Sequence, residues 1–136
     1  MKRMSLYQRD IGINKKNMYK IPDYFKISCI KNNVISQIAF GINFITLFFN
    51  KGFIQFSGSF SVQFNNQRFD YDEVYPVQND YGLLKLLLEK EIVNVLTNER
   101  RNSLVLEFDG KIILELNGNE EYESFRLNLD GFEIIV

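Results

Sequence analysis

The stretch Leu104-Val-Leu-Glu-Phe-Asp-Gly-Lys-Ile-Ile-Leu-Glu-Leu116 predicts a β-hairpin. Apolar residues occupy every second position, as Leu104, Leu106 and Phe108 before the turn and as Ile112, Leu114 and Leu116 after it. Side chains alternate between the two faces of a strand, so each run presents one apolar face. Asp109-Gly110 is a strong turn signal, because a type I′ turn needs two residues that tolerate positive φ.

Runs of the same kind lie on both sides of this hairpin. The pattern predicts strands at residues 34–40, 44–49, 92–97, 122–129 and 132–136, and a short strand within residues 68–76 that ends at Pro76. Residues 53–64 are compatible with one long strand or with two segments broken at Gly58. Asn50–Gly52 and Asp130-Gly131 mark further turns.

One segment changes period and predicts an amphipathic helix at about residues 80–90. Asp80 is the expected N-cap. Four apolar residues then fall at helical spacing, namely Leu83, Leu84, Leu87 and Leu88, while Lys85, Glu89 and Lys90 point outward. Such a helix is expected to pack on a sheet.

The two sides of this helix are similar in sequence. Leu47-Phe-Phe-Asn-Lys-Gly52 aligns with Leu106-Glu-Phe-Asp-Gly110, each between two strands, which indicates a duplicated strand meander. We therefore predict an α+β fold of mostly antiparallel meanders in two related halves with one helix. The pattern is compatible with one continuous sheet and with two packed sheets.

Length and charge predict one domain at residues 18–136 behind a basic N-terminal extension at residues 1–17. Residues 1–31 carry eight Lys or Arg and two Asp, whereas residues 32–136 carry eight Lys or Arg and fifteen Asp or Glu. The leading segment is therefore basic and the body acidic. Because its charges are scattered, we interpret the extension as a solvated, poorly ordered terminus rather than as an arm for nucleic acid or membrane.

The single cysteine, Cys29, excludes an internal disulfide and favours a cytoplasmic location. It is expected to be a small residue of the core. No apolar run approaches the length of a membrane helix.

The chain has no histidine, which removes imidazole acid–base catalysis and most zinc sites. Gly-rich phosphate loops are absent as well. Two acidic groups remain, one at Asp70, Asp72 and Glu73 and one at Glu120, Glu121 and Glu123. Solvated charge is the commoner role for such groups. We expect no enzyme, no catalytic residue, no metal and no cofactor.

Nine Phe lie from Phe40 to Phe69, and the strand at 44–49 is apolar on both faces. A strand of this kind must be covered on both sides. The helix, the second meander and a second subunit are the candidate covers, so a homodimer is an alternative to a simple core.

Two short motifs, Tyr122-Glu-Ser-Phe125 and Gly131-Phe-Glu-Ile-Ile-Val136, give the chain a resemblance to a family of small bacterial proteins of unknown function. Many proteins of that kind occur beside polymorphic toxin genes and are considered immunity proteins. The resemblance implies a non-enzymatic domain that binds and neutralises one toxin, and an acidic body suits a basic toxin. The expected partner-binding residues are Asp70, Tyr71, Asp72, Glu73, Tyr75, Glu120, Glu121, Tyr122 and Glu123. The alternative is a structural or accessory homo-oligomeric domain.

Overall fold

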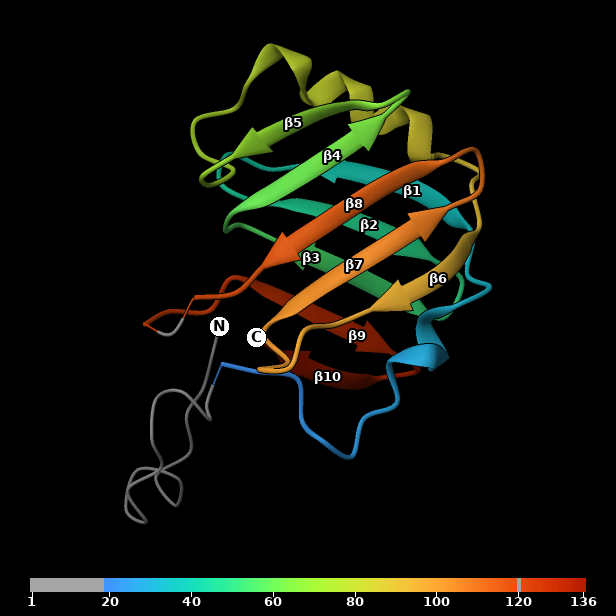
Figure 1. Ribbon diagram of the computed structural model, residues 1–136, viewed down its shortest axis with the longest axis vertical. Helices are drawn as coiled ribbons and strands as arrows, with labels where there is room; N and C mark the ends of the chain where they lie inside the picture. Colours follow the sequence, from blue (N-terminus) through green and yellow to red (C-terminus); the bar gives the residue numbers. More distant parts are fainter. Residues whose placement is uncertain (1–18, 120) are drawn as a thin grey trace.

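The computed structural model describes residues 19–119 and 121–136, and in them the chain forms two five-stranded antiparallel sheets that pack against each other (Figure 1). The first sheet has the order β1-β2-β3-β9-β10 and the second the order β5-β4-β8-β7-β6. The strands are β1 (Ile35–Phe40), β2 (Ile45–Phe49), β3 (Gly52–Phe56), β4 (Phe60–Phe64), β5 (Gln67–Tyr71), β6 (Ile92–Leu96), β7 (Ser103–Phe108), β8 (Ile112–Asn117), β9 (Phe125–Leu129) and β10 (Phe132–Ile135). The short helices are η1 (Ile27–Ile30) and η2 (Asn79–Leu87).

The topology repeats after β5, which confirms the prediction of two related halves. Strands β1, β2 and β3 form a meander in the first sheet, and the β4–β5 hairpin then joins the second sheet beside β8. Strands β6, β7 and β8 form the equivalent meander in the second sheet, and the β9–β10 hairpin joins the first sheet beside β3. Each half therefore completes the sheet of the other.

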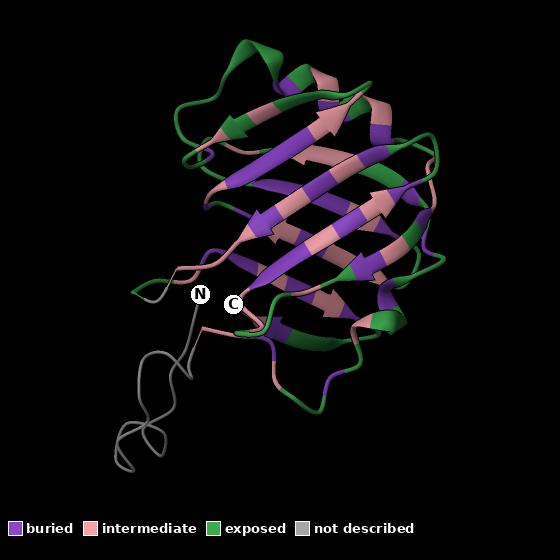
Figure 2. Cartoon of the chain, viewed as in Figure 1, coloured by how far each residue is buried: buried purple, intermediate pink, exposed green. Residues whose placement is uncertain are grey.

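The core lies between the two sheets, where alternate residues of facing strands meet. Figure 2 shows the buried positions alternating along β7 and β8. In β7 and β8 the inward residues are those expected from the alternation, with Leu106 and Leu114 paired and completely buried. Ile54 and Leu127 form the corresponding buried pair in the first sheet. Burial of these aliphatic side chains is the main favourable contribution to folding.

The predicted helix is shorter and of another type than expected. Residues 79–87 form a 3-10 helix, and Gln78 rather than Asp80 is the N-cap, with no side-chain capping hydrogen bond. A 3-10 helix has three residues per turn, and the buried residues Tyr81, Leu84 and Leu87 follow that spacing. Leu88, expected to be inward, is exposed.

Gly58 lies at the point where the chain leaves one sheet for the other, so residues 53–64 form two strands. The backbone N–H groups of Ser57 and Gly58 both donate to the carbonyl of Ser124. A Cβ on Gly58 would lie 2.8 Å from Cβ of Ser124, which explains why no larger residue occupies this crossing.

Two further expectations need correction. Cys29 is exposed on η1 rather than part of the core. The hairpin at Asp109-Gly110 has a three-residue connection, with Phe108 paired to Ile112 and positive φ at Gly110 and Lys111. The Asp130-Gly131 turn has the expected two residues, both with positive φ.

The proposed extension at residues 1–17 lies outside the described residues. In the part of the chain that is described, no helix has the length and apolar character needed to cross a membrane.

Candidate functional site

Ser57 brings the two predicted acidic segments to the same end of the sandwich. Its carbonyl accepts a hydrogen bond from Val74 N–H at 3.1 Å, and its own N–H donates to Ser124 O at 2.9 Å. The loop that follows β5 and the loop that precedes β9 are thus anchored to one residue between β3 and β4. Residues about fifty apart in sequence become neighbours there. We name the surface formed by residues 72–75 and 121–124 the acidic end.

The charged residues of the acidic end are mostly in solvent. Asp72, Glu73 and Glu121 are exposed, and Glu123 is half-buried. Glu120 lies outside the described residues. Tyr75 and Tyr122 are 57% and 53% exposed, so both rings are available to a partner, and large amphipathic rings of this kind are common anchors in protein interfaces.

Asp70 lies on the outward face of β5, beside Arg68. The Arg68 guanidinium donates to Asp70 at 2.9 Å and to Glu115 at 3.3 Å. The hydrogen bond that Arg68 donates to Asp70, followed by the negative charge of Asp70, raises the pKa of Arg68. Asp70 is therefore paired within its own sheet, and its charge is less available to a partner than that of Asp72.

Tyr71 points into the sandwich rather than out of it. Its ring stacks on Phe60 with the centroids 4.8 Å apart and meets Tyr81 edge-on at 5.0 Å. Burial, followed by the hydrogen bond with the Asp80 carboxylate, raises the pKa of Tyr71 above its ordinary value. Tyr71 thus packs against the core beneath the acidic end and is partly buried.

Tyr81 anchors the loop at residues 72–75 from the side of the core. Its hydroxyl donates to the carbonyl of Val74 at 2.6 Å, and Val74 is completely buried. Burial also raises the pKa of Tyr81, and the charges of Asp80 and Glu73 add to that effect. A buried hydrogen bond therefore holds the loop that carries Asp72, Glu73 and Tyr75. The backbone positions of these three exposed residues are fixed by it.

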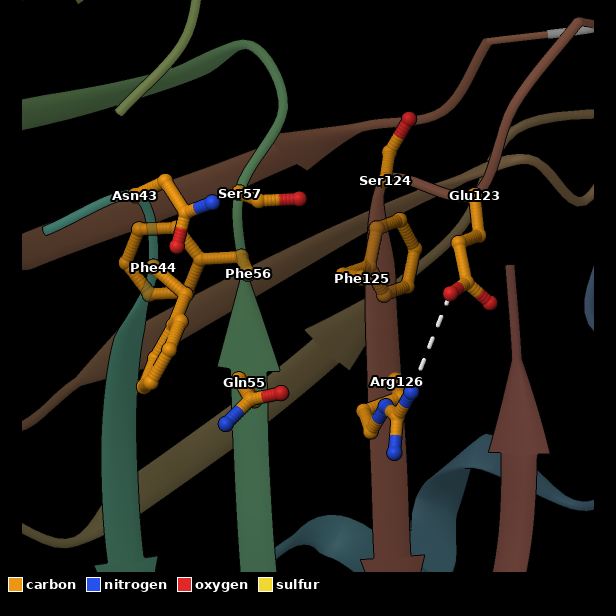
Figure 3. A pocket seen from close by; sticks show the side chains of 9 residues that line it. All are labelled: Asn43, Phe44, Gln55, Phe56, Ser57, Glu123, Ser124, Phe125 and Arg126. Carbon is orange, nitrogen blue, oxygen red and sulfur yellow. Dashed lines mark ion pairs between the residues drawn. The ribbon is translucent and has the colours of Figure 1, made fainter. Parts of the chain in front are cut away.

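A pocket of about 160 Å³ opens beside Ser57, on the outer side of the first sheet (Figure 3). Figure 3 shows Ser57, Glu123 and Ser124 at one end of the view, with Gln55 and Arg126 further along the strands β3 and β9. The lining is Asn43, Phe44, Gln55, Phe56, Ser57, Glu123, Ser124, Phe125 and Arg126.

Arg126 organises the charges of this pocket. Its guanidinium lies 3.2 Å from a carboxylate oxygen of Glu133 and 3.7 Å from Oε1 of Glu123. Glu123 Oε2 and Ser124 Oγ are both buried and have no hydrogen-bond partner among the described residues. Buried polar atoms are usually satisfied, so these two oxygens distinguish the pocket from the rest of the described chain.

The sequence pattern indicated Glu123 but missed Gln55, Ser57 and Arg126. Each of these three looks like an ordinary polar residue on or beside a strand. Only the pairing of β3 with β9 aligns Gln55 with Arg126. The sequence pattern predicted strands at both places but could not show that the two strands pair.

A wider hollow of about 740 Å³ lies on the second sheet near the turns at Asn65-Asn66 and Asp109–Lys111. Glu107 lines this hollow, and its carboxylate accepts a hydrogen bond from the side chain of Asn94. Across the described ranges, no three acidic or cysteine side chains lie close enough together to hold a metal ion.

Comparison with known proteins adds no assignment. No family model matches the chain, and neither the curated proteins nor the solved structures provide a match.

Proposed function

We propose that the chain is a non-enzymatic, immunity-like domain that binds and neutralises a toxin by docking its acidic end against a basic surface. The observation that carries the proposal is the pair of backbone hydrogen bonds through Ser57, because they gather both acidic segments and both exposed tyrosines on one surface. The resemblance described above supports the class of partner.

The composition of the acidic end suits this role. Asp72, Glu73 and Glu121 are exposed carboxylates around the rings of Tyr75 and Tyr122. Charges of one sign at the rim of an interface mainly accelerate association with an oppositely charged partner, and aromatic residues supply contact area. Asp70 and Tyr71, which belong to the same predicted set, contribute less directly in this proposal because their side chains have internal partners.

The test is affinity capture from the native organism with the tagged chain, followed by binding kinetics on the partner recovered. A double variant, Asp72→Asn with Glu73→Gln, removes two charges from the acidic end. A matched variant, Asp109→Asn with Asp130→Asn, removes two from the hairpin turns of β7–β8 and β9–β10. We expect slower association at low salt for the first variant alone. Equal association for the two variants would contradict the proposed surface.

A homo-oligomeric accessory domain is the second candidate, and one observation favours it. Phe48 and Phe53 lie together on the outer face of the first sheet with ring centroids 6.0 Å apart and are only half-buried. The second sheet covers the opposite face, so the described residues leave this pair only partly covered. A dimeric mass in solution that becomes monomeric in Phe48→Ser with Phe53→Ser would support this candidate.

A further inference from the structure

The pocket beside Ser57 has an equivalent place on the other half of the molecule. Ser57 N–H donates to Ser124 O at 2.9 Å where β3 ends, and Asn117 N–H donates to Ser59 O at 2.9 Å where β8 ends. The strand registers support this equivalence. The last residue of β3, Phe56, pairs with Phe125 of β9. In the other half Leu116, near the end of β8, pairs in the same way with Phe60 of β4. Ser57 thus corresponds to Asn117, and Ser124 to Ser59.

The side chains differ between the two equivalent places. The difference leaves a cavity beside Ser57. Asn117 Nδ2 donates to Ser59 Oγ at 3.2 Å, so this pair is satisfied. In the first sheet the shorter Ser57 replaces the asparagine, and Ser124 Oγ, in a residue only 2% exposed, has no partner among the described residues. The cavity of about 160 Å³ lies beside it.

The pocket lining includes acceptor oxygens that face its interior or lack a donor. Gln55 donates its Nε2 to Thr46 Oγ1 at 3.1 Å, which leaves its Oε1 turned toward the strand of Arg126 (Figure 3). Glu123 Oε2 is buried and has no donor among the described residues. A donor group on an occupant would satisfy it.

The charge of the pocket favours a cation. The guanidinium of Arg126 lies between two carboxylates, Glu123 in the lining and Glu133 next to the pocket on β10, so the three groups together carry one negative charge. The ring of Phe44, which is 38% exposed, forms a side wall. Ammonium and guanidinium groups bind favourably to such rings and make short, strong hydrogen bonds to carboxylates.

We infer that this pocket receives one lysine or arginine side chain of the protein partner, with Glu123 as its main acceptor. The inference rests on the proposed function for the source of that side chain and specifies the partner's chemistry. The volume suits the end of one side chain and is well below the size of a typical drug-sized ligand site.

The test uses small probes and does not require the partner. Nα-acetyl-arginine amide is titrated into the ¹⁵N-labelled full chain, and the amide signals of Gln55, Ser57, Ser124 and Arg126 are followed by NMR. The neutral isostere, Nα-acetyl-citrulline amide, is titrated in parallel. We expect saturable shifts with the arginine probe and about tenfold weaker binding of the citrulline probe, because a charge-assisted hydrogen bond is lost.

Two variants sharpen the result. Glu123→Gln removes the main acceptor and should weaken the arginine probe by about tenfold or more. Ser57→Asn copies the arrangement at Asn117 and should close the pocket by donating to Ser124 Oγ, with loss of probe binding and no loss of thermal stability. Glu99→Gln removes an exposed charge from the β6–β7 loop and should bind the probe as the unaltered chain does.

Three results would overturn the inference: no saturable shift in the unaltered chain, equal binding of both probes, or unchanged binding in Glu123→Gln. These outcomes are separate from a failure of the proposed function, which is tested by changes at Asp72 and Glu73 outside the pocket. Suppose that partner binding requires Asp72 and Glu73 but the arginine probe does not bind the pocket. The proposed function would then be supported, and the assignment of the pocket would be wrong.

Discussion

Val34 and Glu91 form an isolated antiparallel bridge, and the two residues occupy equivalent positions in the two halves of the chain. The hydrogen bonds around them are reciprocal. Ile35 N–H donates to Lys90 O at 3.1 Å, and Ile92 N–H donates to Asn33 O at 2.9 Å. The bridge therefore marks an approximate two-fold axis that relates β1–β5 to β6–β10.

Further details repeat across this axis. Asn32 and Glu89, which are equivalent, are both non-glycine residues with positive φ, at 70° and 66°. A bulge interrupts β1 just after Ile35 and β6 just after Ile92. Such irregularities are costly for ordinary residues, so their repetition is best explained by duplication of one ancestral unit.

The first prediction concerns the two halves as separate chains. Residues 1–77 and 78–136, produced separately, should each lack a stable fold, because each half supplies three strands to one sheet and two to the other. Mixed together, they should assemble into the native sandwich. The check is the dispersion of amide signals in NMR spectra of each half and of the mixture. A well-dispersed spectrum from one half alone would contradict the reciprocal arrangement.

The second prediction concerns the close contact of β3 with β9. A Cβ on Gly52 would overlap the backbone oxygen of Asn128. Gly52→Ala should therefore force the strands apart and lower the free energy of unfolding by about 2–4 kcal/mol. Gly82→Ala is the matched control, since nothing lies within 4 Å of a Cβ there. Urea denaturation measures both, and equal stability of the two variants would refute the steric argument.

The third prediction concerns Arg101, which ties the start of the domain to the β6–β7 loop. Its guanidinium donates to the carbonyls of Ile21 at 3.0 Å and of Pro22 and Phe25 at 2.9 Å each. Arg101→Ala should cost about 2–3 kcal/mol of unfolding free energy, because these carbonyls lose charged donors.

Arg101→Lys separates charge from geometry. Lysine keeps the positive charge but lacks the planar fork that reaches several carbonyls at once. It should recover only a minor part of the lost stability in urea denaturation. Full recovery would show that charge alone, through the 3.6 Å contact with Asp23, accounts for the effect.

The fourth prediction concerns stability at high pH. Tyr71 and Tyr81 have folded-state pKa values raised above the ordinary value of 10.0. A raised pKa means that the neutral phenol is favoured in the fold, so its stabilisation is complete below the ordinary pKa and is lost as pH rises above it. The melting temperature should fall as pH rises beyond about 10.

Tyr71→Phe tests which residue causes this loss. Phenylalanine keeps the ring that stacks on Phe60 and removes the ionising hydroxyl, so its melting temperature should depend less on pH above about 10. Tyr122→Phe removes an exposed hydroxyl outside the core and should follow the unaltered chain. A steeper dependence in Tyr71→Phe would contradict the assignment.

The sequence by itself determined where most strands lie and which residues of β7 and β8 face inward, although β9 begins at Phe125 rather than at Tyr122. Alternation in Leu104–Leu116 predicted the β7–β8 hairpin and the burial of Leu106 and Leu114, because a strand has a side-chain period of two whatever it packs against. The similarity around Asn50 and Asp109 likewise predicted related halves. The type of the helix at 79–87 and the exposure of Cys29 were not predicted, because both depend on how a short segment packs against the rest of the chain.

Only the tertiary structure decided how the strands are distributed and what the site contains. Whether residues 53–64 continue in one sheet or cross at Gly58 depends on contacts with Ser124, more than sixty residues away. The same long-range pairing sets Gln55 beside Arg126 and joins the loops of Asp72 and Glu121 through Ser57. Local sequence fixes the period of a strand, but its neighbours are selected by the burial of its inward face against distant strands.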